Sequence, residues 1–294
     1  MDRATWLEWR RQGIGGSDIA AIMGRSPWAG PWDVWCSKVH GADQPDRPEL
    51  VTGRRLERAV AEYARDRMAE IRGVEPTDLD LEPGRPIKVG ILLGSPDFVV
   101  ITGIEGGGPQ PHVLLGQGLE CKTARYPDEQ WGPDLSDQVP ESYRLQVRWY
   151  LALTGAREWW LAVFFTAAHD WRLYRIERDL DEQRELVEFA ETWWQRHVVG
   201  GEPPEVDASD ACRDWLVGQS PTARDEIRAA TGDEEMLARD VHAAEQATKS
   251  LEAEAARARN RLRASMGDVR RVYFTGGAAT WSRKSNRLTV RIDP

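Results

Sequence analysis

Two acidic residues and a lysine stand where neighbouring strands could bring them together. The run SPD ends in Asp97, and the later run GLECKTA contains Glu120 and Lys122. Because successive side chains of a strand alternate between its faces, Glu120 and Lys122 share one face, opposite Leu119 and Cys121. Alone, this pair fits an ion pair on a solvated strand face, and Asp97 fits a turn residue. Together, two carboxylates and an ammonium could hold a divalent metal such as Mg²⁺ beside a phosphate.

Lysine is the minority choice among the basic residues of this chain. There are 39 lysines and arginines, and the lysines stand only at positions 38, 88, 122, 249 and 284. The ammonium of lysine is a compact point charge, whereas the guanidinium of arginine is a planar fork. Background use of lysine could still account for Lys122, so its rarity only adds weight to a chemical role.

Two helices are predicted in the N-terminal part of the chain. Ser17 stands where an N-cap belongs, before the apolar run DIAAIM that Gly24 closes. A second helix is predicted over residues 53–72, where apolar residues recur at helical spacing. Glu57 borders that apolar stripe, and by its position alone it fits a solvated residue on the flank of the helix.

A third helix is predicted over residues 140–154, beginning on a proline. It carries Gln146 on one ridge with Tyr143 and Tyr150, which by themselves fit surface and packing residues. Strands are predicted before this helix in IKVGILLG, DFVVITGI and HVLLGQGLECKT, with the glycine-rich IEGGGPQPH as a hairpin loop, and after it in WWLAVFFTA and WRLYRIE. The helix DLDEQRELVEFAETWWQRHVVGG follows. This order is typical of a mixed α/β domain.

Five sequence blocks together carry a family resemblance. They are W-x-x-x-R-x-x-G-I-G-G-S at residues 6–17, TGRRLE at 52–57, SPD at 95–97, LECK at 119–122 and YRLQVRWYLALTG at 143–155. In this order the blocks resemble YqaJ-type viral recombinases, the lambda-exonuclease-like branch of the PD-(D/E)xK nuclease superfamily. The resemblance implies an α/β fold: a restriction-endonuclease-like core with a mixed central sheet flanked by helices.

The resemblance also implies roles for individual residues. Lys122 matches the lysine that orients the attacking water and stabilises the phosphate, and Gln146 matches a helix glutamine that holds the nucleophile or a phosphate. The family's metal site, for Mg²⁺ with Mn²⁺ expected to substitute, corresponds here to the side chains of Asp97 and Glu120, the main-chain carbonyl of Cys121 and the assisting carboxylate of Glu57.

Arg10 and Ser17 resemble the residues that receive the 5′-phosphate of a DNA end in these enzymes. A helix N-terminus with glycine amides and a hydroxyl can bind a phosphate, and Arg10 would add a forked positive charge. The alternative is that Ser17 only caps its helix while Arg10 is exposed to solvent. Asp18 is unfavourable beside an anion unless its side chain turns away along the helix.

Charge and spacing depart from what the resemblance leads one to expect. The net charge of −9 disfavours nucleic-acid binding over the whole surface, because phosphates are contacted mainly by Lys and Arg. The interval between Asp97 and Glu120 is long for the family, so the insertion EGGGPQPH would have to loop away from the site. Local basic surfaces could still bind DNA, and the candidate residues are Arg54, Arg55, Arg58, Arg65, Arg283, Lys284, Arg287 and Arg291.

Two domains are expected: a nuclease domain over residues 1–204, and a tail over 205–294 with a long helix or helical hairpin and a small terminal β-hairpin. The Ala/Glu/Arg-rich run at 236–266 predicts the helix. Cys36, Cys121 and Cys212 lack the spacing of a disulfide framework, a zinc site or an iron–sulfur cluster. No run approaches the ~20 apolar residues of a membrane span, so we expect a soluble protein in the cytoplasm of a bacterium or phage-infected host.

The resemblance implies a Mg²⁺-dependent deoxyribonuclease that acts 5′ to 3′ on linear double-stranded DNA during phage-type recombination. Its implied partners are double-stranded DNA ends, a single-strand annealing protein and further copies of the chain in a ring-shaped trimer. An endonuclease of the same fold is one alternative. Another is a non-catalytic module that binds DNA ends, although such a role does not need carboxylates that repel phosphate.

Overall fold

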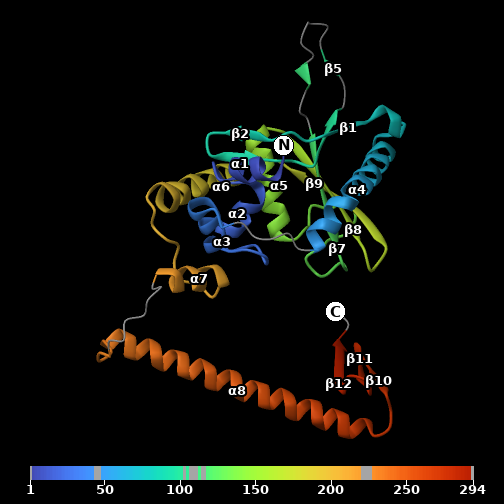
Figure 1. Cartoon of the computed structure of the whole chain (residues 1–294). Coiled ribbons are helices and arrows are strands. Elements are labelled where there is room, and N and C mark those ends of the chain that lie inside the picture. The colour runs from blue at the N-terminus through green and yellow to red at the C-terminus, as the bar shows by residue number, and fades with distance from the viewer. Residues whose placement is uncertain are drawn as a thin grey trace. The chain divides into compact units, whose positions relative to one another are not determined.

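A five-stranded mixed sheet forms the centre of the first unit in the computed structural model (Figure 1). The structure describes residues 2–42, 48–101, 104–105, 112–113, 117–219 and 227–292. The strands lie in the order β1 (Asp80–Pro83), β4 (Phe98–Ile101), β7 (Gln117–Ala124), β8 (Glu158–Phe165) and β9 (Asp170–Glu177). Strands β7 and β8 are parallel and the other neighbours are antiparallel. This sheet with its flanking helices confirms the predicted fold class.

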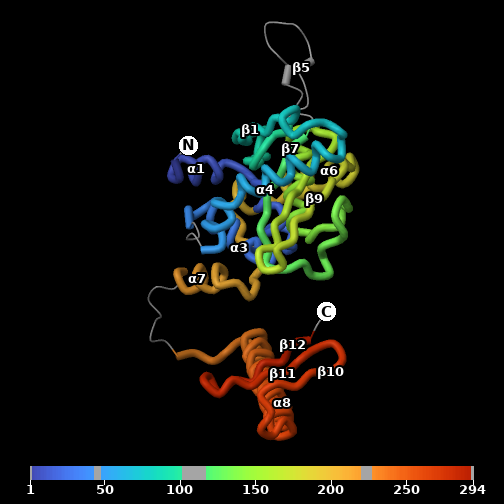
Figure 2. Tube along the Cα trace, turned by 90° about the vertical axis from the view of Figure 1, so that its right-hand side faces the viewer, coloured from blue at the N-terminus to red at the C-terminus, as the bar shows by residue number. Residues whose placement is uncertain are grey.

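Helices cover both faces of the sheet, and each face has its own buried apolar cluster (Figures 1 and 2). Helix α4 (Pro48–Arg72) packs on one face through Val60, Ala64 and Met68. Helix α5 (Glu141–Thr154) connects β7 to β8 and contributes to the cluster on the other face, together with α2 (Gly16–Ile22), α3 (Pro31–Trp35) and α6 (Leu180–Trp193). Strand β8 is apolar along nearly its whole length because both of its faces are buried.

Shorter elements complete the first unit. They are α1 (Arg3–Arg10), a π-helical turn (Cys36–His40), a 3-10 turn (Pro76–Asp78), the hairpin of β2 (Ile87–Val89) and β3 (Leu92–Gly94), the pair β5 (Ile104–Glu105) and β6 (His112–Val113), a second π-helical turn (Trp194–Val199) and α7 (Asp210–Gln219). Helix α7 contacts α3, and its Cys212 is buried with Trp32 and Trp35.

The chain divides into two compact units, Met1–Pro221 and Thr222–Pro294. The second unit contains α8 (Gly232–Met266), a single uninterrupted helix, and a small sheet in the order β10 (Arg271–Phe274), β11 (Gly277–Ser282) and β12 (Arg287–Ile292). Strands β11 and β12 form the predicted terminal hairpin, and β10 adds a third strand. The expected boundary after residue 204 falls ahead of α7.

Several predicted elements differ from the structure in extent or partner. Helix α4 begins at Pro48, a full turn before the predicted start at residue 53, and the run IKVGILLG folds as the separate β2–β3 hairpin. Strand β1 was not predicted, because its short run DLEP lacks β-branched and aromatic residues. In the predicted glycine-rich loop, residues 106–111 lie outside the described residues.

No helix among the described residues combines the length and apolar character needed to span a membrane.

Candidate active site

The site lies where β4 separates from β7. Pairing of the two strands ends at Phe98 and Leu119, so the next residues of β7 have no partner from β4. The carboxylate of Asp97 occupies this gap and accepts the main-chain N–H of Cys121 at 2.7 Å. In an extended strand the N–H and C=O of one residue face the same edge. The carbonyl of Cys121 therefore faces the edge at which Asp97 lies, beside Glu120.

Glu120 is the most buried acid of this group, with 3% of its side chain exposed. Its Oε1 accepts hydrogen bonds from the Lys122 ammonium at 2.6 Å and from the Gln146 amide at 2.6 Å. Its Oε2 is buried and has no hydrogen-bond partner. A buried oxygen without a partner is costly and rare. Oε2 of Glu120 therefore lacks the hydrogen-bond donor or cation that a buried carboxylate oxygen usually has.

Neighbouring acids raise the pKa values of Glu120 and Glu57, and one lysine opposes this effect. Burial, the neighbouring Asp97 and the more distant Glu57 raise the pKa of Glu120 to about 8, against the opposing effect of Lys122. Burial also raises the pKa of Asp97, and burial together with Asp97 raises the pKa of Glu57. Acids held together in this way favour a cation among them.

The donors fit a hard divalent cation. Asp97 and Glu120 supply carboxylate oxygens, one of them unpartnered, and Cys121 supplies a carbonyl on the same edge. Among the residues that the structure describes, no three His, Cys, Asp or Glu side chains are close enough together to hold a metal ion. A cation here would complete its shell with the carbonyl, water or substrate, which is the usual way that Mg²⁺ binds.

Helix α5 holds the lysine and the glutamate in place. The Gln146 carbonyl oxygen accepts from Lys122 at 3.0 Å, while its amide also reaches the hydroxyl of Tyr150 at 3.1 Å. That hydroxyl donates to the main-chain oxygen of Ser95 at 3.3 Å, next to the SPD run. The Lys122 ammonium lies 5.1 Å from the centroid of the Tyr143 ring. One face of α5 thus supports the whole cluster.

Tyr143 and Tyr150 were not among the predicted site residues, although the sequence contained a signal for them. They stand three residues before and four residues after Gln146, so helical spacing places all three on one ridge. Sequence patterns alone could not show that this ridge faces Lys122 rather than the core. Both tyrosines have raised pKa values, chiefly because they are buried.

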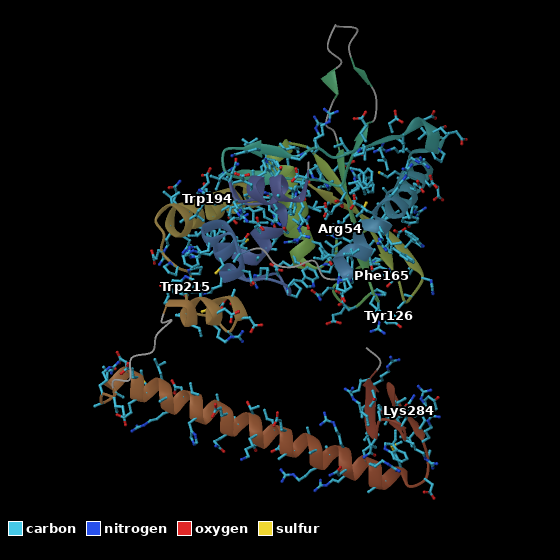
Figure 3. All side chains as sticks on the ribbon, viewed as in Figure 1. Arg54, Tyr126, Phe165, Trp194, Trp215 and Lys284 are labelled. Carbon is cyan, nitrogen blue, oxygen red and sulfur yellow. The ribbon has the colours of Figure 1, made fainter. Side chains whose placement is uncertain are left out.

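Glu57 approaches from the opposite face of the sheet. Helix α4 packs close to β7 at Gly53, where a Cβ atom would lie 3.6 Å from the Thr123 hydroxyl oxygen. Glu57 lies one turn further along the helix and is half-buried. Arg54, labelled in Figure 3, lies on the same helix, is exposed and lowers the pKa of Glu57. Glu57 is therefore near the carboxylate pair, in electrostatic contact with Asp97 and Lys122.

Arg10 and Ser17 form a second cluster with two further charges. The Arg10 guanidinium donates to the Ser17 hydroxyl at 3.2 Å and pairs with the carboxylate of Asp18. The buried ammonium of Lys38 donates to Asp18 at 2.7 Å and to the main-chain oxygen of Arg10 at 2.7 Å. Burial opposes ionisation of Asp18, but Arg10 and Lys38 together keep its pKa below the ordinary value.

One expectation about this cluster is wrong. Gly15, not Ser17, is the N-cap of α2, and its N–H donates to Asp18 at 2.9 Å, so Ser17 is the second helical residue with its hydroxyl facing Arg10. Asp18 does not turn away: it is the centre of the cluster. The sequence could not reveal Lys38 as a member, because this residue comes from a separate helical turn that tertiary packing brings to α2.

The two clusters are neighbours through Gly16. A Cβ atom at this position would lie 3.0 Å from Gln146 and 3.0 Å from the Tyr150 ring. Glycine therefore favours this close approach of the start of α2 to α5, because a Cβ atom would press on both side chains. The Arg10–Ser17 cluster and the carboxylate cluster therefore adjoin the same ridge of α5.

The chain matches one family model and is similar to several known proteins. The model of the YqaJ-like viral recombinase domain matches residues 5–157. The chain is 25% identical to the protein YqaJ of Bacillus subtilis (strain 168), over 99% of this chain and 87% of that protein. Among solved structures it is similar to an alkaline exonuclease of Laribacter hongkongensis, at 15% identity over 75% of this chain and 100% of the other, with a TM-score of 0.45. It is also similar to a phage-related exonuclease of Haemophilus somnus 129PT, at 11% identity over 67% of this chain and 100% of the other, with a TM-score of 0.43.

Proposed function

The chain belongs to the family of YqaJ-like viral recombinases, whose domain covers residues 5–157, and from this premise we propose that it is a metal-dependent deoxyribonuclease. The observation that carries the proposal is the environment of Glu120. Its buried Oε2 has no partner, it lies beside Asp97, and its other oxygen is bonded to Lys122. A structural ion pair would not need a second acid and an unsatisfied oxygen at the same edge.

Asp97, Glu120 and the main-chain carbonyl of Cys121 are the proposed metal ligands, with Glu57 assisting from α4. Mg²⁺, or Mn²⁺ in its place, would supply Lewis-acid activation of the scissile phosphodiester and of the attacking water. The unpartnered oxygen of Glu120 and the raised pKa values of the three acids support a cation at this place.

Lys122 and Gln146 have complementary roles in the proposed reaction. Lys122 presents a point charge to the phosphate, whose oxygens become more negative as the nucleophile attacks. Its position is set by hydrogen bonds to Glu120 and Gln146. Gln146 holds this lysine and Glu120 in one geometry, and its own position is set by Tyr150. Such fixed positions matter because small displacements of reacting groups are costly in rate.

The proposed substrate is the end of linear double-stranded DNA, digested from 5′ to 3′. Arg10 and Ser17 would receive the 5′-phosphate. The Arg10 guanidinium would then either leave Asp18 for the phosphate or contact both groups at once. The proximity of this cluster to Gln146 through Gly16 supports one continuous path from the terminal phosphate to the scissile bond. The buried Lys38 keeps Asp18 neutralised during that exchange.

The single strand left by such digestion would be the substrate of an annealing protein in phage-type recombination. A ring of three chains around the DNA would keep the enzyme on its substrate. Both parts of the proposal rest on the family to which the chain belongs.

A nuclease assay tests the function directly. Linear duplex DNA with a 5′-phosphate, labelled at either end in separate reactions, is incubated with the protein in Mg²⁺ or in EDTA. We expect release of nucleotides from the 5′ ends in Mg²⁺ only. Asp97→Asn and Glu120→Gln should abolish release, whereas Glu62→Gln, an exposed glutamate on α4, should not. Activity that survives EDTA or Asp97→Asn would remove the proposed site.

The same assay separates the alternatives. Closed circular DNA has no ends, so its digestion would identify an endonuclease. Binding to DNA ends, with no nucleotide released in Mg²⁺ or in Mn²⁺, would identify a binding module.

A further inference from the structure

The small sheet of the second unit has two unlike faces. Directly opposed residues of antiparallel strands share a face. The register pairs Arg271 with Thr280 and Thr280 with Thr289, and pairs Tyr273 with Ala278 and Ala278 with Arg291. One face, which we call the basic face, therefore carries Arg271, Tyr273, Ala278, Thr280, Ser282, Arg287, Thr289 and Arg291.

The other face of this sheet is apolar and is turned toward the end of α8. It carries Val272, Phe274, Ala279, Trp281, Leu288 and Val290 by the same register. Ala279 is fully buried, and so nearly is Met266 at the end of α8. The Arg263 guanidinium, also from α8, lies 3.8 Å from the centroid of the Trp281 ring. The helix covers only the part of this side around Ala279 and Trp281, since Phe274 and Val290 are exposed. The basic face is open to solvent, because Arg271, Tyr273, Arg287 and Arg291 are all exposed.

Positive charge is concentrated here against the balance of the chain. The whole protein has 39 Lys and Arg against 48 Asp and Glu. Residues 270–292 contain no acid, and their basic residues are Arg270, Arg271, Arg283, Lys284, Arg287 and Arg291. Lys284 lies in the turn between β11 and β12 and is labelled in Figure 3. An ordinary solvated surface has charges of both signs interspersed. A surface that binds a polyanion instead gathers positive charges in one place.

The basic face also offers an aromatic ring. Tyr273 is 75% exposed, and its neighbour on the strand face, Arg271, lies 5.3 Å from the ring centroid. The central strand places only the small side chains of Ala278, Thr280 and Ser282 between the arginines of the outer strands. No large side chain of that strand therefore shields the ring. Arg287 and Arg291 stand about 13 Å apart along β12, at ~3.3 Å for each residue.

We propose that this basic face binds single-stranded DNA. The arginines would contact phosphates along the strand, and Tyr273 would stack on a base. Single-stranded rather than duplex DNA fits because the bases of a duplex are stacked on each other and cannot lie on an exposed ring. The choice of DNA rests on the proposed function, since digestion of one strand of a duplex leaves the other as a single strand.

Binding of a fluorescent oligo-dT to the full-length protein tests this inference. The measurement is made by anisotropy in EDTA, where no hydrolysis is expected. The double variant Arg287→Ala/Arg291→Ala should weaken binding by at least about tenfold, and should make the dependence of log K on log salt shallower by about 1.4, at ~0.7 for each phosphate contact. Tyr273→Ala should weaken binding by about tenfold, and Tyr273→Phe should restore it.

The matched control is Arg228→Ala/Arg239→Ala, which removes two exposed arginines of the same unit that pair with Glu234 and Glu235. This variant should bind like the wild type, and circular dichroism should show that all variants melt alike. Equal weakening by the control pair would mean that only overall charge matters. Unchanged binding by the Arg287/Arg291 variant would also overturn the proposal.

A duplex arm distinguishes the form of DNA. If the basic-face variants weaken binding of a blunt duplex and leave oligo-dT unaffected, then the face binds duplex DNA and the inference is wrong. Failure of the proposed function appears separately. A protein that binds oligo-dT through the basic face yet releases no nucleotides in Mg²⁺ would refute the nuclease and leave this inference standing.

Discussion

The buried carboxylate of Glu120 should make the metal-free protein less stable as the pH rises, and Glu120→Gln should remove this dependence. Burial beside Asp97 raises the pKa of Glu120 from 4.5 to about 8. Between these values the folded protein holds a proton that the unfolded chain has released. Stability from this residue is therefore greatest below the unfolded pKa, and it is lost as the pH rises through the folded one.

The magnitude follows from the size of the pKa shift. One pKa unit corresponds to about 1.4 kcal/mol, so raising the solution from about pH 5.5 to about pH 7.5 should lower the free energy of unfolding by up to ~3 kcal/mol. The pKa of about 8 already includes the opposing effect of Lys122, so no further reduction is made for that contact. Glutamine keeps an acceptor for both donors but cannot ionise, so the variant should lack this part of the slope.

Urea unfolding at a series of pH values in EDTA measures the effect. The quantity compared is the difference in free energy of unfolding between wild type and Glu120→Gln at each pH. It should grow in favour of the variant from pH 5.5 to pH 7.5, by about 1–3 kcal/mol. Glu62→Gln is the control, because this glutamate is 55% exposed and pairs with Arg58 within one helix. Parallel curves for wild type and Glu120→Gln would refute the assignment of a raised pKa to this residue.

Four further outcomes are expected. Mg²⁺ at about ten times its Kd should stabilise the wild type by ~1.4 kcal/mol at pH 8, seen as a higher Tm, and an equal shift in Asp97→Asn would exclude this carboxylate as a ligand. Gly16→Ala should lower the rate of DNA digestion about tenfold with little change in Tm, because the new Cβ atom would press on Gln146 and Tyr150; full activity would contradict the proposed role of this ridge. Arg10→Ala should remove any preference for 5′-phosphate over 5′-hydroxyl ends, while Arg25→Ala, an exposed arginine, should keep it; a preference that persists in Arg10→Ala would place the phosphate elsewhere. Gly118→Ala should destabilise the fold by ~1–3 kcal/mol, since its Cβ atom would lie 1.9 Å from the Trp159 ring, whereas Gly218→Ala has open space and should be neutral or stabilising in denaturant unfolding.

Local patterns were sufficient for the parts of the site that lie within one element. Alternation along a strand places Glu120 and Lys122 on one face, and the structure joins their side chains at 2.6 Å. Helical spacing likewise places Gln146, Tyr143 and Tyr150 on one ridge. These relations follow from the periods of strand and helix, which are properties of the backbone and do not depend on the rest of the chain.

Contacts between distant segments required the folded chain. Sequence placed Asp97 near Glu120 only as a possibility, and it was the end of the β4–β7 pairing that put its carboxylate on the Cys121 N–H. The membership of Lys38 in the Arg10 cluster has the same origin, since the two residues meet only through packing of separate helices. Which strands pair in a sheet also depends on distant segments. The run IKVGILLG, for example, forms the separate β2–β3 hairpin and is not part of the central sheet.

The sequence by itself therefore determined which side chains could act together within a strand or a helix, and the order of blocks that places the chain in its family. Tertiary structure alone decided how far each charge was removed from water and which other charges it met. The physical reason is that periodicity is set by neighbouring residues, whereas burial and electrostatic environment are set by whichever segments fold against them. The unpartnered oxygen of Glu120 belongs to the second kind: it becomes costly only when β7 is covered by α5 on one face and joined by Asp97 at its edge.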